Sequence, residues 1–94
     1  MEHTLVIIPT YNERENIALM IDAILGDYPA IHLLVVDDNS PDGTSALVEN
    51  KKSDFPKRLF LETRQKKQGL GTAYIHGFKW AITRDYEYVF ETDE

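Results

Sequence analysis

Short apolar runs alternate along this chain with segments whose apolar residues recur every three or four positions. Two continuous runs span residues 4–9, where Pro9 stops the run, and 32–36, while weaker runs span 58–62 and 86–91. Runs of this length, rich in Val, Ile and Leu, are typical of strands buried on both faces of a parallel sheet. The pattern therefore predicts four strands, of which the third lies nearer to an edge of the sheet.

Three segments with helical spacing separate these runs. The first predicted helix starts at Asn12, which we expect to act as its N-cap together with Glu15, and ends at Gly26. Pro41 is placed in the first turn of the second helix, where a missing N–H costs nothing. The third helix is predicted from Thr72 onward, with small residues that allow close packing against the sheet.

The resulting order is β-α-β-α-β-α-β, which implies right-handed crossovers and a mainly parallel sheet with helices on both faces. The predicted fold class is therefore α/β and Rossmann-like. A chain of 94 residues makes one domain at most. We find no internal repeat, low-complexity tract or linker, so almost all of residues 1–94 are expected to form one packed domain.

The composition of the chain argues against several classes of protein function. Ten basic residues against sixteen acidic ones give a net charge of −6, which argues against a general nucleic-acid binder. The absence of cysteine excludes thiol chemistry, disulfides and Cys-based zinc sites. The N-terminal residues show no signal-peptide pattern, and no apolar stretch approaches the ~20 residues that span a bilayer. Membrane contact, if it occurs through these residues, is expected to be peripheral.

Acidic residues follow the second predicted strand directly. Asp37 and Asp38 end that strand, and Asp42 precedes the next helix. In open α/β sheets, ligands bind at the carboxyl ends of the strands, so this pair is a candidate for contact with a base, a ribose or a metal ion. The alternative is that these carboxylates cap the following helix through its N-terminal donors.

Three further segments are expected at the same sheet edge. Tyr11 can stack on a nucleobase and Glu13 can accept a hydrogen bond from a ligand, although these residues by themselves favour packing for Tyr11 and a helix-dipole role for Glu13. The basic, glycine-containing loop around Lys67 suits a phosphate but is also compatible with an ordinary solvated loop. Asp93 ends the last strand beside Glu91, and carboxylates favour Mg²⁺ or Mn²⁺, but one Asp does not establish a metal site.

Taken in order, segments 7–16, 35–44 and 67–79 resemble the family 2 glycosyltransferases. The wording DNSPDGT at 38–44 and GLGTAY at 69–74 is similar to the polyprenol-phosphate (dolichol-phosphate) mannosyltransferase branch of that family. The resemblance covers essentially the whole chain. It implies a GT-A type fold, of which residues 1–94 form the N-terminal, nucleotide-sugar-binding half.

The resemblance also assigns site residues. Those it implies as nucleotide-sugar contacts are Pro9, Tyr11, Glu13, Val36, Asp38, Lys67, Asp93 and Glu94. Asp93 matches the first acid of the family's metal-binding Asp-x-Asp, which would hold Mg²⁺ or Mn²⁺. Thr92 stands where Met is usual, Glu94 stands where Ala is usual, and the second Asp would fall one residue past Glu94.

The reaction implied is transfer of mannose from GDP-mannose to a polyprenyl (dolichyl) phosphate with inversion at the anomeric carbon. The lipid acceptor implies work at the cytoplasmic, inner face of a membrane. No catalytic residue is assigned within 1–94, so this chain is expected to bind the donor and to be inactive by itself. A partial domain would expose a sheet edge, which leads us to expect homo-oligomers.

Two alternatives remain open at this stage. The first is a family 2 glycosyltransferase that uses another nucleotide sugar, such as UDP-glucose. The second is a receiver-like signalling module, in which paired acids at a strand end hold Mg²⁺ and one accepts a phosphate. Against the second, neither a phosphoacceptor on a later strand nor the required Lys near the end of the sheet is visible.

Overall fold

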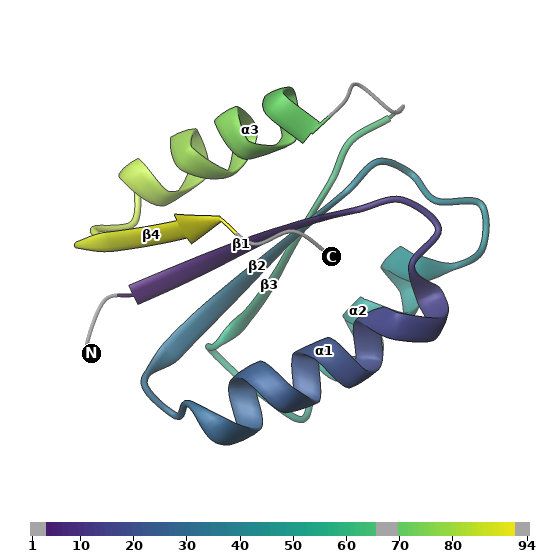
Figure 1. Ribbon diagram of the computed structural model, residues 1–94, viewed down its shortest axis with the longest axis horizontal. Helices are drawn as coiled ribbons and strands as arrows, with labels where there is room; N and C mark the ends of the chain where they lie inside the picture. The colour runs from purple at the N-terminus through teal and green to yellow at the C-terminus, as the bar shows by residue number, and fades with distance from the viewer. Residues whose placement is uncertain (1–3, 66–69, 92–94) are drawn as a thin grey trace.

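Strands and helices alternate along the chain as the apolar pattern predicts (Figure 1). The computed structural model describes residues 4–65 and 70–91. The elements are β1 (Thr4–Thr10), α1 (Arg14–Asp27), β2 (Ile31–Asp37), α2 (Thr44–Lys51), β3 (Leu59–Thr63), α3 (Leu70–Ile82) and β4 (Tyr88–Glu91).

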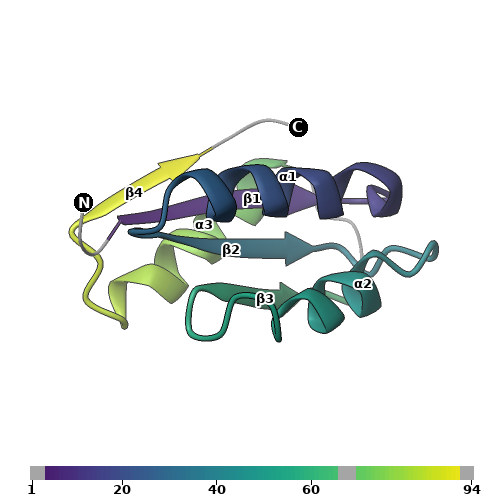
Figure 2. The same cartoon turned by 90° about the horizontal axis from the view of Figure 1, so that it is seen from below.

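The four strands form one parallel sheet in the order β3-β2-β1-β4 (Figure 2). β3 lies at an edge, which confirms the prediction for the third strand. From β1 the chain moves outward through β2 to β3, and α3 then carries it back to the other side of β1. The strand order therefore reverses between β1 and β4, and in open α/β sheets such a reversal is where ligands bind.

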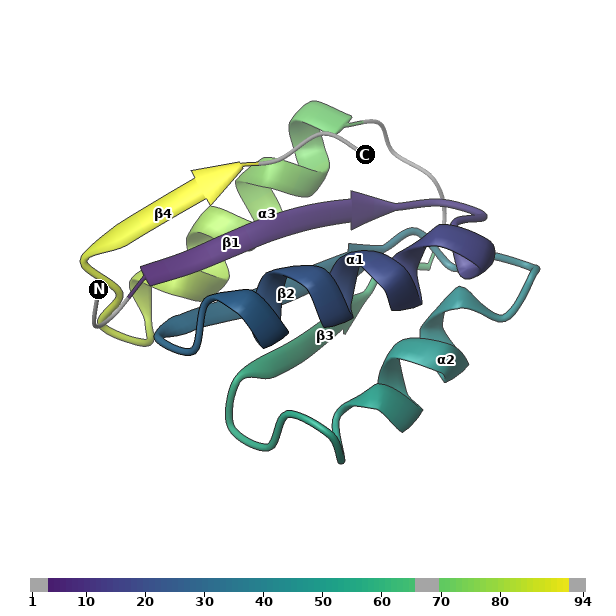
Figure 3. The ribbon, with the colours of Figure 1, turned by 60° about the horizontal axis from the view of Figure 1, so that its bottom comes forward.

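Helices cover both faces of the sheet, and each face has its own core (Figure 3). The core under α1 and α2 consists of Ile8, Ile17, Ile21, Leu25, Leu33, Val35, Val48 and Leu59. The core under α3 consists of Leu5, Ile7, Leu34, Val36, Ala73 and Ala81. Successive residues of β1 and β2 alternate between these cores, so both strands are buried on two faces as predicted. Each large aliphatic side chain buried in this way stabilises the folded state by about 1.5–3 kcal/mol relative to the exposed side chain.

The first strand does not stop at Pro9, as the sequence pattern suggested, but continues to Thr10. The backbone N–H of Asp38 donates to the Thr10 carbonyl oxygen at 3.1 Å, so the backbone of Thr10 faces β2. The backbone N–H and C=O groups of successive residues in a strand point alternately toward its two neighbouring strands. Pro9 therefore turns its backbone nitrogen away from β2. Among the residues that the structure describes, the pairing of β1 with β4 extends to Ile7 and Glu91, and the missing N–H of Pro9 interrupts none of those bonds.

The predicted helix ends need three corrections. Asn12 is not the N-cap of α1, because its φ of 57° is left-handed and the helix begins at Arg14. Gly26 lies inside α1, which ends one residue later at Asp27. Pro41 lies in the loop before α2 rather than in its first turn, since the left-handed Gly43 (φ 89°) delays the start of the helix.

The third helix and the fourth strand also differ slightly from their predicted bounds. α3 begins at Leu70, two residues before Thr72. β4 begins at Tyr88 rather than Tyr86, because the Tyr86 ring packs beside α3 and its hydroxyl shares a 2.8 Å hydrogen bond with His32 Nδ1. Burial of this hydroxyl raises the pKa of Tyr86 above its ordinary value.

Candidate functional site

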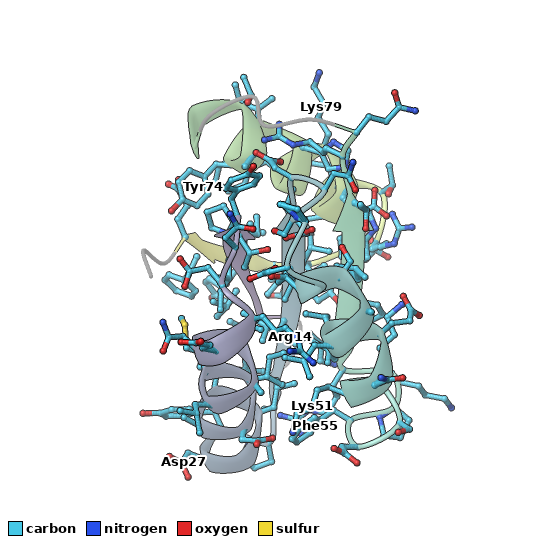
Figure 4. All side chains as sticks on the ribbon, turned by 90° about the vertical axis from the view of Figure 1, so that its right-hand side faces the viewer. Arg14, Asp27, Lys51, Phe55, Tyr74 and Lys79 are labelled. Carbon is cyan, nitrogen blue, oxygen red and sulfur yellow. The ribbon has the colours of Figure 1, made fainter. Side chains whose placement is uncertain are left out.

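The carboxyl ends of β1, β2 and β3 meet at one edge, onto which Figure 4 looks directly. Side-chain and backbone bonds tie these ends together. Thr10 Oγ1 donates to Asp37 Oδ1 at 2.7 Å. The backbone N–H of Arg64 donates to the backbone carbonyl oxygen of Asp37 at 2.8 Å. The predicted gathering of polar residues at this edge is thus confirmed for the residues that the structure describes.

Asp37 organises the loop that follows β2. Its carboxylate is fully buried and accepts hydrogen bonds from the Thr10 hydroxyl, the Ser40 N–H (2.9 Å), the Ser40 hydroxyl (2.6 Å) and the Ser45 hydroxyl (2.8 Å). Such a set of donors satisfies a buried charge without a ligand. Of the two roles open to the acidic pair, Asp37 therefore takes the structural one.

The same loop also caps α1 from outside the helix. Three donor–acceptor pairs connect the segments: Asn12 N to Ser40 Oγ (2.8 Å), Glu13 N to Thr44 Oγ1 (3.2 Å) and Arg14 N to Asp42 Oδ2 (3.1 Å). The backbone amides of Asn12, Glu13 and Arg14 therefore have partners within the protein and are not open donors for an anion. This cross-loop capping explains why the local capping box predicted from Asn12 and Glu15 does not form.

Asp42 serves both helices. One of its carboxylate oxygens accepts from Arg14 N–H in α1, and the other accepts from the N–H of Thr44, the first residue of α2, at 3.0 Å. The hydrogen bond from the Thr44 hydroxyl, followed by the amide bonds and the nearby Arg14 charge, lowers the pKa of Asp42 below its usual 3.8. The capping role that the sequence left open for Asp42 is confirmed.

Asp38 makes a different contact, a two-pronged ion pair with Arg64. Arg64 Nε donates to Asp38 Oδ1 at 2.6 Å and Arg64 Nη2 donates to Oδ2 at 2.8 Å. The two side chains are only 6% and 8% exposed. Arg64 Nη1 also donates to Thr72 Oγ1 in the first turns of α3, at 3.0 Å. The ion pair therefore connects the ends of β2 and β3 with the start of α3.

Sequence reasoning did not single out Arg64. One signal for it was available, because Arg64 is the first residue after the third strand. In a parallel sheet that position falls at the same edge as Asp38. Among basic residues, arginine is the type whose planar fork matches a carboxylate.

The other predicted contact residues occupy different depths of this edge. Pro9 and Val36 are register partners across β1 and β2, and both are buried. The Val36 side chain lies in the core under α3. Tyr11 is 37% exposed and Glu13 is half-buried, in the loop that follows β1. The predicted contacts Lys67, Asp93 and Glu94 lie outside the described residues.

A pocket of about 620 Å³ opens beside Arg64, between the end of β3 and one face of α3. Arg64 and Gln65, which follow β3, line it on one side, and Thr72, His76 and Lys79 line it from α3. Its volume lies within the ~300–1,000 Å³ range of small-molecule sites. Tyr74 and Lys79 mark α3 in Figure 4, while Arg14 marks the start of α1.

No cluster of three metal-ligating side chains occurs within residues 4–65 and 70–91. The predicted metal ligand Asp93 follows β4, whose last residue, Glu91, is the register partner of Ile7 in β1. None of the helices formed by the described residues has the length and apolar character of a membrane-spanning helix.

The strand order argues against the receiver-like alternative. Receivers have the order 2-1-3-4-5, in which β1 lies between β2 and β3. Here β1 lies between β2 and β4, and the order 3-2-1-4 is that of a Rossmann-like sheet.

Comparison with curated proteins gives close relatives. The chain is 48% identical over 92 residues to the polyprenol monophosphomannose synthase of Mycolicibacterium smegmatis, covering 98% of this chain and 35% of the relative. It is 43% identical over 89 residues to the undecaprenyl-phosphate mannosyltransferase of Micrococcus luteus, with coverages of 95% and 36%. The dolichol-phosphate mannosyltransferase of Pyrococcus furiosus is 41% identical over 78 residues, with coverages of 81% and 22%. The chain thus spans about a third or less of the length of these relatives.

A solved structure and a family match agree with these relatives. The mannosyltransferase of Pyrobaculum calidifontis in complex with GDP-Man and Mn²⁺ superposes with a TM-score of 0.76 at 30% identity, covering 83% of this chain and 24% of that chain. This superposition confirms the expected GT-A type fold. The sequence pattern of "Glycosyl transferase family 2" matches residues 5–94. The chain belongs to glycosyl transferase family 2.

Proposed function

We propose that this chain is the donor-binding part of an enzyme that transfers mannose from GDP-mannose to a polyprenyl phosphate. The relatives named for such lipid acceptors support the acceptor class. The solved mannosyltransferase whose structure contains GDP-Man and Mn²⁺ supports the donor and the metal. On this proposal residues 1–94 form the nucleotide-sugar-binding unit.

The donor would lie where the strand order reverses, at the carboxyl ends of β1 and β4. Tyr11 and Glu13 follow β1 there, and Asp38 follows β2 beside them. Asp38 would accept from the base, while Pro9 and Val36 shape the floor below it through the paired backbones of β1 and β2. The backbone amides of Asn12, Glu13 and Arg14 are already bonded within the protein, so the diphosphate would be held by other groups.

Those groups would be Lys67, Asp93 and Glu94 together with a divalent cation. The path of the chain supports this role for the residues that follow β4, because β4 runs parallel to β1 toward the edge that carries Tyr11. A carboxylate plus substrate phosphates is the ligand set that Mg²⁺ and Mn²⁺ favour. When bound, the cation neutralises the negative charge that develops on the departing diphosphate.

The residues of this chain would contribute binding and orientation rather than proton transfer. The acceptor phosphate is anionic at neutral pH and needs little general-base assistance. Holding the donor in one orientation at the switch point prepares the anomeric carbon for attack from the opposite side, with inversion. A polyprenyl acceptor places this work at the inner, cytoplasmic surface of a membrane, with the protein bound peripherally. We also propose that the chain forms homo-oligomers.

One observation carries the proposal: the edge with Tyr11 and Asp38 lies at the topological switch point of a chain that is 48% identical to a polyprenol monophosphomannose synthase. The experiment is calorimetric titration of the 94-residue chain with GDP and with UDP, each in the presence of Mn²⁺. Guanine presents two adjacent N–H donors to the acidic groups of this edge, whereas uracil presents one, and a carboxylate oxygen that already accepts a bond from Arg64 can accept a second one. We therefore expect GDP to bind about 10-fold more tightly or better, the value of one further bond to a charged group.

Two results would contradict this assignment. Tighter binding of UDP than of GDP would favour the alternative donor class, such as UDP-glucose. Equal binding before and after chelation of Mn²⁺ would remove the metal from the proposal.

A further inference from the structure

We infer that Arg64 is a positioning residue for nucleotide recognition, and that it acts through Asp38 rather than on the nucleotide itself. The inference rests on the proposed nucleotide-binding function of this edge. It adds a residue that the sequence resemblance does not assign.

The first argument is the geometry of the ion pair. Two parallel bonds, of 2.6 and 2.8 Å, hold the Asp38 carboxylate in the plane of the guanidinium. A single contact would leave the carboxylate able to rotate about its last bond, whereas a fork fixes its orientation. The carboxylate proposed to read the base is therefore already oriented in the protein.

The second argument is that Arg64 is itself held at both ends. Its backbone N–H donates to the Asp37 carbonyl at 2.8 Å, which anchors the main chain to β2. Its Nη1 donates to Thr72 Oγ1 at 3.0 Å, which anchors the guanidinium to α3. A group supported from two elements transmits its own position to its partner, as supporting residues do behind many ligand-binding side chains.

A matched control residue, Arg58, lies at the amino ends of the strands, opposite the proposed donor site. Arg58 is also partly buried, and it donates three hydrogen bonds to the carbonyls of Ile31 (3.1 Å), Leu25 (3.0 Å) and Tyr28 (2.8 Å). These bonds join the amino ends of β2 and β3 to the end of α1, away from the proposed donor site. Arg58 therefore has the structural role of a buried arginine without the proposed positioning role.

The experiment measures GDP affinity of the 94-residue chain by calorimetry with Mn²⁺, and stability of each variant by urea unfolding. Arg64→Gln is expected to weaken GDP binding by about 10-fold, the lower end of the usual cost of losing a supporting partner. Arg58→Gln is expected to lower stability as well but to change GDP affinity by less than about 2-fold, because the binding edge is intact. Arg64→Lys keeps the charge without the fork and is expected to restore only part of the affinity.

A double-mutant cycle separates action through Asp38 from direct contact. Asp38→Asn should weaken GDP binding, and adding Arg64→Gln to it should cause little further loss, since the group that Arg64 positions has already been altered. The double variant replaces both charges with amides, which a fold tolerates better than one unpaired buried charge. It therefore keeps the test available if Arg64→Gln alone does not fold.

Different failures identify different errors. Losses that add fully in the double variant would mean that Arg64 contacts the nucleotide directly and would overturn the inference. The same holds if Arg64→Gln and Arg64→Lys bind GDP as the wild type does. A folded wild-type chain that binds neither GDP nor UDP would overturn the proposed function, and this inference with it.

Discussion

Two adjacent carboxylates, Asp37 and Asp38, have different roles because strand geometry turns them to opposite faces of the sheet. Asp37 faces α2, where the Ser45 hydroxyl is one of its donors. Asp38 faces α3 and meets Arg64. The sequence showed that this position carries acids, but it left open which acid caps and which one is available for recognition. The contacts from the other strands and helices give Asp37 the structural role and pair Asp38 with Arg64, while a recognition role for Asp38 stays a prediction.

Asp42 gives a prediction on pH dependence at the residue scale. Its pKa is lowered in the folded state, chiefly by the Thr44 hydroxyl, so the unfolded chain binds the proton more readily. The stabilisation from Asp42 is therefore present above its unfolded pKa of 3.8 and is lost as the pH falls through the lower folded pKa. We expect Asp42→Asn to lower the urea midpoint at neutral pH, and this difference to shrink as the pH falls below 3.8.

The measurement is urea unfolding of both proteins across the acid range, followed by circular dichroism. Asp27→Asn is the control, because the structure shows no side-chain bond between Asp27 and another described residue. A constant difference between wild type and Asp42→Asn at every pH would contradict the assignment of the effect to the Asp42 charge.

At the scale of elements, α3 packs on β1 through Gly77. A Cβ atom built on Gly77 would lie 2.7 Å from Ile7 Cδ1 and 2.9 Å from Ile7 Cγ2, which is closer than carbon atoms approach. Ile7 is itself fully buried in the core under α3, so a shift of its side chain would disturb the packing of that core. Gly77, one of the small residues that the sequence pattern placed on this helix, is therefore required by the contact with the central strand.

We expect Gly77→Ala to destabilise the fold by about 1–3 kcal/mol, the usual cost of overpacking a core. Urea unfolding measures this change. Adding Ile7→Val, which removes the Cδ1 atom, should recover part of the loss. Gly26→Ala is the matched control, because nothing lies within 4 Å of its added Cβ, and it should stabilise α1 by about 0.5–1 kcal/mol. Gly77→Ala with unchanged or increased stability would refute the packing argument.

Element boundaries show where local patterns fail. The start of α1 was predicted from Asn12 and Glu15 alone, yet its amides are capped by Ser40, Asp42 and Thr44 from the next loop. Those acceptors are about thirty residues away in sequence, so a rule based on neighbouring residues does not detect them. Apolar runs, by contrast, predicted all four strands, because β1, β2 and β3 pack against both cores and β4 packs against one.

At the scale of the whole molecule, β4 leaves one side chain layer uncovered. Val89 packs into the core under α3, whereas Tyr88 and Phe90 are 54% and 50% exposed. By alternation these two rings lie on the other face of the sheet, where α1 and α2 cover β2 and β3. Adjacent exposed aromatic rings on an edge strand favour association.

We therefore expect this chain to self-associate with rising concentration, as measured by sedimentation velocity. Phe90→Thr keeps strand propensity but removes apolar surface, and it should shift the distribution toward monomer. Tyr28→Thr alters an exposed aromatic residue outside β4 and should leave the distribution unchanged. A wild-type chain that stays monomeric at all concentrations would contradict the proposal of homo-oligomers.

The sequence by itself determined the alternation of elements, the parallel sheet covered on two faces, and the family resemblance, because apolar period and contiguous motifs are local properties. Only the tertiary structure decided the strand order β3-β2-β1-β4, and with it the switch point beside Tyr11. It also decided that Asp38 meets Arg64, 26 residues later in the chain. Such pairings depend on which strands are neighbours, and no local pattern encodes that choice.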